Sequence, residues 1–200
     1  MRLFSPTAIF RRVTNITPEY LHGHGIRALI LDVDNTLTEH GSQELLPEVA
    51  AWLQRMRAEG IRLVIASNNM PKRVAPFARR VGLDYLAFCC KPSPLGLYRA
   101  RRAMGVPRSA VALVGDQIFT DALGANLYGI PILLVQPMRQ DTKPTIRLKR
   151  MLEKPILARY DKKGGLRYGW DAGQAQEICA PRGEPEPAPN AKAARPERRP

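Results

Sequence analysis

The sequence is poor in cysteine, aromatic residues and acidic residues, and it has no long apolar run. The cysteines number three, and Cys89 and Cys90 are adjacent, which disfavours a structural disulfide. No Arg-rich phosphate loop follows this pair, so a catalytic thiol is disfavoured as well. The apolar stretches, such as 131–135, are too short to span a bilayer, and the N-terminus lacks the apolar segment of a secretory signal. We expect a cytoplasmic protein without a membrane span.

The shortage of acidic residues leaves a strong positive charge, with 31 Lys and Arg against 18 Asp and Glu, or +13. Residues 139–170 hold ten basic and three acidic residues, whereas residues 171–200 hold five of each. The excess therefore lies in the part expected to fold, especially in a basic C-terminal extension, 139–170. It does not lie in the Pro-, Ala-, Glu- and Arg-rich tail, 171–200, which we expect to be disordered. Such a charge favours an anionic partner, although a solvated basic face that aids solubility is an equal alternative.

Short β-branched apolar runs alternate with amphipathic helical stretches from about residue 27. The expected strands are 27–32, 61–66, 84–88, 110–115 and 130–135, and the expected helices are 47–60, 72–82, 93–105 and 120–129. This alternation predicts an α/β protein with a three-layer, doubly wound parallel sheet over residues 27–138. Residues 1–26 are expected to pack on this core as an arm or helix, and 144–159 as a basic amphipathic element interrupted at Pro155.

Polar residues follow these runs where the predicted strands end. Asp32 and Asp34 follow the first strand, Ser67 and Asn68 the second, Lys91 the third and Asp116 the fourth. Since ligands of open α/β sheets bind beyond the carboxyl ends of the strands, we expect these groups to meet at one edge. Helix capping alone would explain some of them, but not Lys91 or the second carboxylate at Asp34.

These residue types suit phosphoryl transfer to a carboxylate. One ionised carboxylate attacks phosphorus and a second acid protonates the leaving oxygen, and Asp32 and Asp34 provide both groups. Cations must offset the charge of the phosphate, so we expect Mg²⁺ at Asp116 and a fixed charge from Lys91. The expected phosphate contacts are Thr36, Ser67, Asn68 and Lys91. Asp121 is expected to bind the metal or to orient its ligands.

The quoted residues resemble the four motifs of the haloacid dehalogenase (HAD) superfamily, in order. They are Asp-x-Asp-x-Thr-Leu at 32–37, Ser67-Asn68-Asn69, Lys91-Pro92 and Gly115-Asp116-Gln117-x-x-Thr120-Asp121. The likeness covers about residues 1–160 and is closest to the subfamily IIIA phosphatases of the bacterial YqeG type. It implies that Asp32 is the nucleophile, Asp34 the acid/base, and Asp32, Asp116 and the Asp34 carbonyl the Mg²⁺ ligands.

Many HAD phosphatases carry a cap domain inserted after the first or second motif. Here 34 residues separate Asp32 from Ser67 and 23 separate Ser67 from Lys91, and one helix and one strand fill each interval. An open site without a cap, or with a minimal one, would suit a phosphate displayed on a large partner such as a lipid.

Relatives of this type include phosphatidylglycerophosphate phosphatases, so the resemblance suggests that substrate and peripheral contact with the inner face of an anionic membrane. Soluble sugar phosphates, nucleotides and phosphoproteins are alternative substrates. An RNA- or ribosome-associated binding module is a third hypothesis, opposed by the aromatic content of 6% and by the absence of aromatics interleaved with basic residues. The sequence leaves the oligomeric state open.

Overall fold

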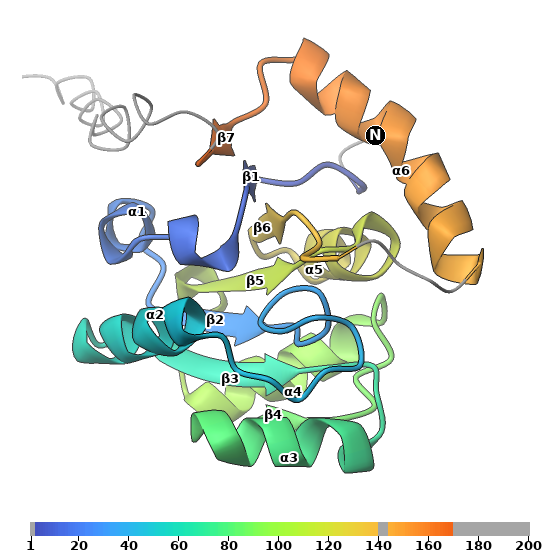
Figure 1. The fold of residues 1–200 in the computed structure, drawn as a ribbon. Coiled ribbons are helices and arrows are strands. Elements are labelled where there is room, and N and C mark those ends of the chain that lie inside the picture. The colour runs from blue at the N-terminus through green and yellow to red at the C-terminus, as the bar shows by residue number, and fades with distance from the viewer. Residues whose placement is uncertain (1–2, 140–143, 170–200) are drawn as a thin grey trace, which may run out of the picture.

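The structure is a computed structural model that describes residues 3–139 and 144–169. Its helices and strands alternate along most of the chain (Figure 1). The strands are β1 (Ala8–Phe10), β2 (Ala28–Leu31), β3 (Arg62–Ala66), β4 (Tyr85–Leu86), β5 (Val111–Gly115), β6 (Ile132–Val135) and β7 (Arg167–Tyr168). The helices are α1 (Pro18–Gly23), α2 (Pro47–Ala58), α3 (Pro71–Val81), α4 (Pro94–Met104), α5 (Leu123–Tyr128) and α6 (Pro144–Lys162), with short turns η1 (Val13–Asn15), η2 (Arg108–Ala110) and η3 (Ile118–Ala122).

All seven strands form one parallel sheet in the order β4-β3-β2-β5-β6-β1-β7. The interior strand β2 lies between β3 and β5, and Leu31 pairs with Ile65 on one side and Val114 on the other. The residues that follow these partners therefore leave the sheet at the same level. The α/β class and the parallel sheet agree with the sequence prediction.

Helices cover both faces of the sheet and close two apolar cores. One core joins α1, α2 and α3 to the sheet, and the other joins α4, α5 and α6 to the opposite face. Parallel strands need such double cover because both of their faces are apolar, and β2 is fully buried. The interval between β2 and β3 holds only α2, and the interval between β3 and β4 only α3, so neither holds an inserted domain.

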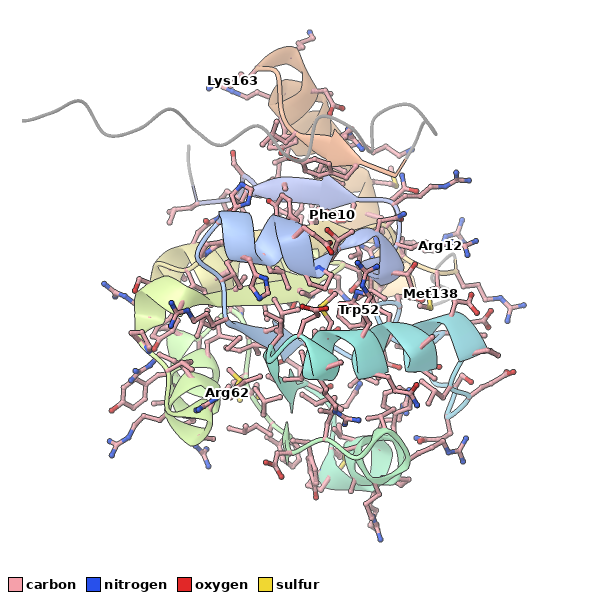
Figure 2. All side chains as sticks on the ribbon, turned by 90° about the vertical axis from the view of Figure 1, so that its left-hand side faces the viewer. Phe10, Arg12, Trp52, Arg62, Met138 and Lys163 are labelled. Atoms are coloured by element: carbon pink, nitrogen blue, oxygen red, sulfur yellow. The ribbon has the colours of Figure 1, made fainter. Side chains whose placement is uncertain are left out.

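The N-terminal segment does more than pack as the expected arm or helix. It supplies α1 and also β1, which pairs with β6 and β7 inside the sheet. The Trp52 indole Nε1 donates a hydrogen bond of 2.7 Å to the carbonyl of Ile16, which ties α2 to this segment (Figure 2). A three-residue strand has too few alternating positions to be recognised from the sequence, and Phe10, fully buried, shows its place only in the structure.

The predicted break at Pro155 is wrong, because α6 continues through it from Pro144 to Lys162. Proline removes the hydrogen bond to the carbonyl four residues earlier, but Pro155 and Met151 both lie on the exposed side, where water can serve that carbonyl. The opposite side packs Ile156, Leu157 and Tyr160 on the core.

Two other predicted elements differ at their ends. The strand expected at 84–88 is reduced to Tyr85–Leu86, and Phe88 and Cys90 adopt positive φ as the chain turns toward Lys91. The helix expected from residue 120 begins earlier, as the wide turn η3 that carries Asp121.

The predicted disordered tail, 171–200, lies outside the described residues. Within those residues, no helix is both long and apolar enough to cross a membrane.

Candidate active site

The carboxyl ends of β2, β3 and β5 bring the predicted site residues to one edge of the sheet. Asp32 follows β2 directly, and its backbone N–H still donates to the Val114 carbonyl of β5 at 2.9 Å. Ser67 follows β3 and Asp116 follows β5. All three side chains belong to residues that are at most 8% exposed. By the register of the three strands, Asp32 is level with Ala66 and Gly115, so Ser67 and Asp116 lie one residue farther along at the same edge.

Lys91 lies between two carboxylates. Its Nζ is 2.7 Å from Asp32 Oδ1 and 2.7 Å from Asp121 Oδ1. The ammonium group is buried, and burial alone would lower the pKa of Lys91, but Asp121 and Asp32 outweigh it and raise that pKa above its ordinary value. Lys91 is therefore a permanent positive charge beside Asp32.

Asn68 holds the backbone of Lys91. Its Nδ2 donates to the Lys91 carbonyl at 2.9 Å, and the Lys91 N–H donates to its Oδ1 at 2.6 Å. These two bonds connect the end of β3 with the loop after β4. They also engage both polar atoms of the Asn68 side chain. The structure therefore shows Asn68 positioning Lys91, and its contact with phosphate stays a prediction.

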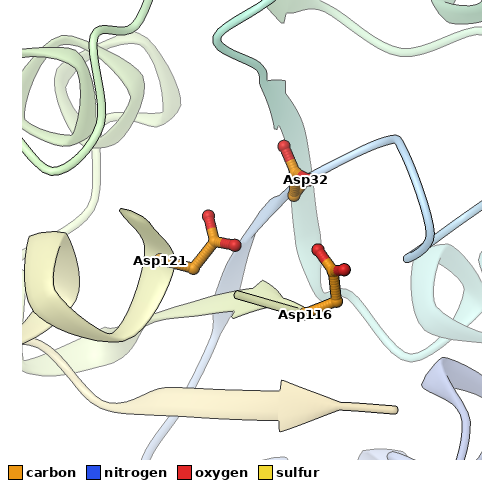
Figure 3. A group of neighbouring side chains, drawn as sticks. All are labelled: Asp32, Asp116 and Asp121. Carbon is orange, nitrogen blue, oxygen red and sulfur yellow. The ribbon is translucent and has the colours of Figure 1, made fainter. Parts of the chain in front are cut away.

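Three carboxylates converge on one space (Figure 3). One oxygen from each of Asp32, Asp116 and Asp121 lies within 4.8 Å of the other two, and all three residues are buried. Gly115 allows this approach, because a Cβ added there would lie 2.5 Å from Asp121 Cγ. Among the described residues, Asp116 Oδ1 is buried without a hydrogen-bond partner. Such a set of oxygen donors fits a hard divalent cation.

Crowding of these groups changes their protonation. Burial raises the pKa of Asp32 to about 6 from an ordinary 3.8, with Lys91 opposing the shift and Asp121 adding to it. Burial also raises the pKa of Asp116, while Arg150 opposes and Asp121 and Asp32 reinforce the rise. Both shifts come first from burial, and the neighbouring carboxylates add to them, so a cation bound here would favour the ionised forms.

Asp34 points to a different set of partners. Its carboxylate accepts hydrogen bonds from Asn69 Nδ2 at 2.6 Å, Arg73 at 2.8 Å and the Gly41 N–H at 2.8 Å. His40 Nδ1 lies 3.8 Å from the same carboxylate. Arg73 was not among the predicted site residues. Arg73 lies on the first turn of α3, four residues after Asn69, which also binds Asp34. This short spacing from a motif residue is the sequence signal by which Arg73 could have been predicted.

The two predicted hydroxyl groups lie in different surroundings. Ser67 is 2% exposed, and its Oγ accepts the Asn69 N–H at 3.1 Å. Thr36 is buried, and its Oγ1 has no hydrogen-bond partner among the described residues. Thr36 also lines a cavity of about 350 Å³ together with Arg11, Arg12 and Glu39.

Helix α6 contributes two site residues that sequence reasoning missed. Arg150 donates to the Asp116 carbonyl at 2.6 Å and also binds Asp116 Oδ2. Glu153, 3% exposed, accepts the Ile118 N–H at 2.8 Å and binds Arg150 at 3.0 Å. Glu153 is the lone acidic residue in 144–160, which was a usable signal. Arg150 could not be distinguished in the sequence from the many basic residues around it.

Comparisons with known proteins assign this fold and site to a class. The family described as haloacid dehalogenase-like hydrolase matches residues 40–129, and the family described as mitochondrial PGP phosphatase matches residues 1–75. A 4-nitrophenylphosphatase structure from Thermotoga maritima superposes with a TM-score of 0.50 at 16% identity, covering 62% of this chain and 90% of that one. This likeness supports the fold alone. The molecule is a HAD-type hydrolase.

Two curated relatives narrow the assignment. The chain is 31% identical over 167 residues to the Bacillus subtilis protein named "Probable phosphatase YqeG", covering 84% of this chain and 97% of the relative. It is 26% identical over 156 residues to phosphatidylglycerophosphate phosphatase 1 of Arabidopsis thaliana, covering 73% of this chain but 45% of the plant protein. The chain therefore belongs to the YqeG-type phosphatases of the HAD superfamily.

Proposed function

We propose that this protein is a Mg²⁺-dependent phosphomonoesterase that forms an aspartyl-phosphate at Asp32 and hydrolyses phosphatidylglycerophosphate to phosphatidylglycerol. The observation that carries the chemistry is Asp32 at the carboxyl end of β2, with its Oδ1 2.7 Å from Lys91 Nζ and its carboxylate grouped with Asp116 and Asp121. The substrate rests on the likeness to the plant phosphatidylglycerophosphate phosphatase and to the PGP phosphatase family.

In this mechanism an Asp32 carboxylate oxygen attacks phosphorus while the P–O bond to the glycerol oxygen breaks. Lys91 keeps Asp32 oriented and offsets the charge on the phosphoryl oxygens, which Ser67 and nearby backbone N–H groups bind. Asp34 donates a proton to the leaving oxygen and then takes one from the water that cleaves the aspartyl-phosphate. Asn69 and Arg73 hold Asp34 during both transfers.

A divalent cation belongs to the same proposal. Asp32, Asp116 and the Asp34 carbonyl would hold it, and the unpartnered Asp116 Oδ1 is an available ligand. When bound, Mg²⁺ would neutralise charge on the phosphoryl oxygens and the carboxylates. Asp121 already binds Lys91 and accepts the Gln117 N–H at 3.1 Å, so its part is to hold Lys91 and the start of η3.

The proposed place of action is the inner face of an anionic membrane, where the protein binds peripherally. Neither interval that could hold a cap does so, which leaves the strand ends accessible to a phosphate presented on a large surface. The basic excess in 139–170 provides electrostatic attraction to anionic lipids.

The test measures phosphate release by the purified full chain with Mg²⁺. Vesicles that contain phosphatidylglycerophosphate are compared with a panel of sugar phosphates, nucleotides and phosphopeptides, and Asp32→Asn serves as the inactive control. The proposal predicts faster release from the vesicles than from any soluble compound. Good hydrolysis of a soluble phosphate with none from the vesicles would replace the lipid by that substrate class. Salt-sensitive RNA binding that survives Asp32→Asn, without phosphatase activity, would overturn the proposal altogether.

A further inference from the structure

Helix α6 exposes an apolar stripe on its outer side. Leu148, Met151 and Leu152 are 58%, 63% and 55% exposed, and Pro155 and Ala158 are also exposed. Residues spaced by three or four positions lie on one side of a helix, so these five form a continuous surface. Figure 1 shows α6 at the periphery, with the rest of the described chain on one side of it.

The contacts of the inner side fix this orientation. Ile156, Leu157 and Tyr160 pack on the core, while Arg150 and Glu153 bind groups at Asp116 and Ile118. Turning the stripe inward would break these contacts and leave Asp116, which is buried, without its Arg150 partner. The contacts on the inner side of α6 therefore keep the apolar stripe on its outer side facing the exterior.

Exposed cations surround the stripe. Arg147, Lys149, Lys154 and Arg159 are all exposed. Glu153 is the single acidic residue between 146 and 160, and it is buried on the inner side. The outer side of this part of α6 thus combines large apolar side chains with positive charge and presents no carboxylate.

We propose that the outer side of α6 is the surface by which this protein docks on an anionic lipid membrane. Apolar side chains that enter the headgroup region beside Lys and Arg that bind lipid phosphates are the features of an interfacial helix. A second copy is a poorer occupant, because pairing this face with itself would bring like charges together. A nucleic acid would use the cations but leave Leu148, Met151 and Leu152 exposed to water.

The proposal rests on the proposed function, since it supplies the contact that brings the enzyme to a lipid-borne phosphate. Arg150 joins the docking helix to Asp116, so the outer side of α6 is separated from the active site by the width of one helix, about 10 Å. Docking on α6 would hold an active site without an inserted cap close to the membrane that presents its substrate.

The experiment measures co-sedimentation of the full chain with vesicles of phosphatidylcholine alone and with vesicles that also contain phosphatidylglycerol. The test variant replaces Leu148, Met151 and Leu152 by Gln, which keeps helix propensity. The control is Leu127→Gln, because Leu127 is a large apolar side chain that is 51% exposed but belongs to α5 and not to the α6 stripe. Hydrolysis of 4-nitrophenyl phosphate reports the state of the active site.

We expect the wild type and Leu127→Gln to bind the anionic vesicles, with weak binding to phosphatidylcholine. The triple variant should bind about tenfold more weakly or worse, with unchanged hydrolysis of 4-nitrophenyl phosphate. Vesicle binding by the triple variant that equals that of the wild type overturns the proposal. A triple variant that still binds vesicles but no longer self-associates, where the wild type does, overturns it as well. Because the vesicles contain no phosphatidylglycerophosphate, this result is independent of whether that lipid is the substrate.

Discussion

Arg150 binds Asp116 twice, through the backbone carbonyl at 2.6 Å and through side-chain Oδ2, and it leaves Oδ1 of the same carboxylate unpartnered among the described residues. A residue of the C-terminal helix thus orients a carboxylate of the β5 strand end without occupying all of it. Glu153 completes the arrangement by binding both Arg150 and the Ile118 N–H.

This relationship predicts that Arg150→Gln weakens Mg²⁺ binding about tenfold or more, as is usual when a group that orients a metal ligand is lost. Isothermal titration of metal-free protein with Mg²⁺ measures the effect without relying on activity. Arg147→Gln, on the exposed side of the same helix, should bind Mg²⁺ as the wild type does, and Arg150→Lys should recover part of the affinity. Tighter binding in Arg150→Gln would mean that Arg150 competes with the metal and does not position its ligand.

Replacing Lys91 should damage both folding and catalysis. Lys91→Met leaves Asp32 and Asp121 buried without their shared cation, which should lower the free energy of unfolding by about 3–5 kcal/mol. Phosphate release should fall at least about a hundredfold. Denaturant unfolding and a phosphatase assay measure the two effects, with Lys72→Met on the exposed start of α3 as the control. Unchanged unfolding would contradict the buried three-residue arrangement.

Asn68 should act through Lys91. Asn68→Ala removes both bonds to the Lys91 backbone, so we expect a lower kcat with little change in KM. Asn126→Ala, which loses side-chain bonds to the carbonyls of Leu3 and Ser5, is the matched control and should keep full activity. A raised KM at constant kcat would instead support the phosphate contact predicted from the sequence.

The raised pKa of Asp32 predicts a pH dependence of stability for the metal-free protein. Between 3.8 and about 6, the folded state keeps a proton on Asp32 that the unfolded chain releases. Stability from this group is therefore greatest at the acid end and decreases as pH rises through that window, by about 3 kcal/mol at most. The measurement compares wild type with Asp32→Asn by unfolding in the presence of a chelator. A difference that grows in favour of the wild type as pH rises would contradict the shift.

The sequence could predict five of the seven strands and most of the candidate site, because those strands and the helices between them have local signals. The strand before Asp32 is a buried apolar run, and Gly82, Gly105 and Gly129 end their helices in the left-handed conformation that glycine favours. Asp116 was predicted because it directly follows such a strand, β5, and Lys91 because it follows the strand predicted at 84–88.

What could not be predicted depends on contacts between distant segments. β1 has three residues, and its place between β6 and β7 follows from pairing with segments more than 100 residues away. Arg150 is one basic residue among many, and only the packing of α6 shows that it reaches Asp116. The partners of Asp34 come from the start of α3 and from the loop at Gly41, which no local pattern joins.

The central claim is that Asp32 accepts the phosphoryl group. The most direct measurement is to quench the full chain with acid during turnover, reduce it with borohydride, and locate the product by peptide mass spectrometry. An acyl phosphate at Asp32 would be reduced to homoserine at position 32, absent from Asp32→Asn and from protein without substrate. Homoserine at another aspartate, or none during demonstrated turnover, would contradict the account.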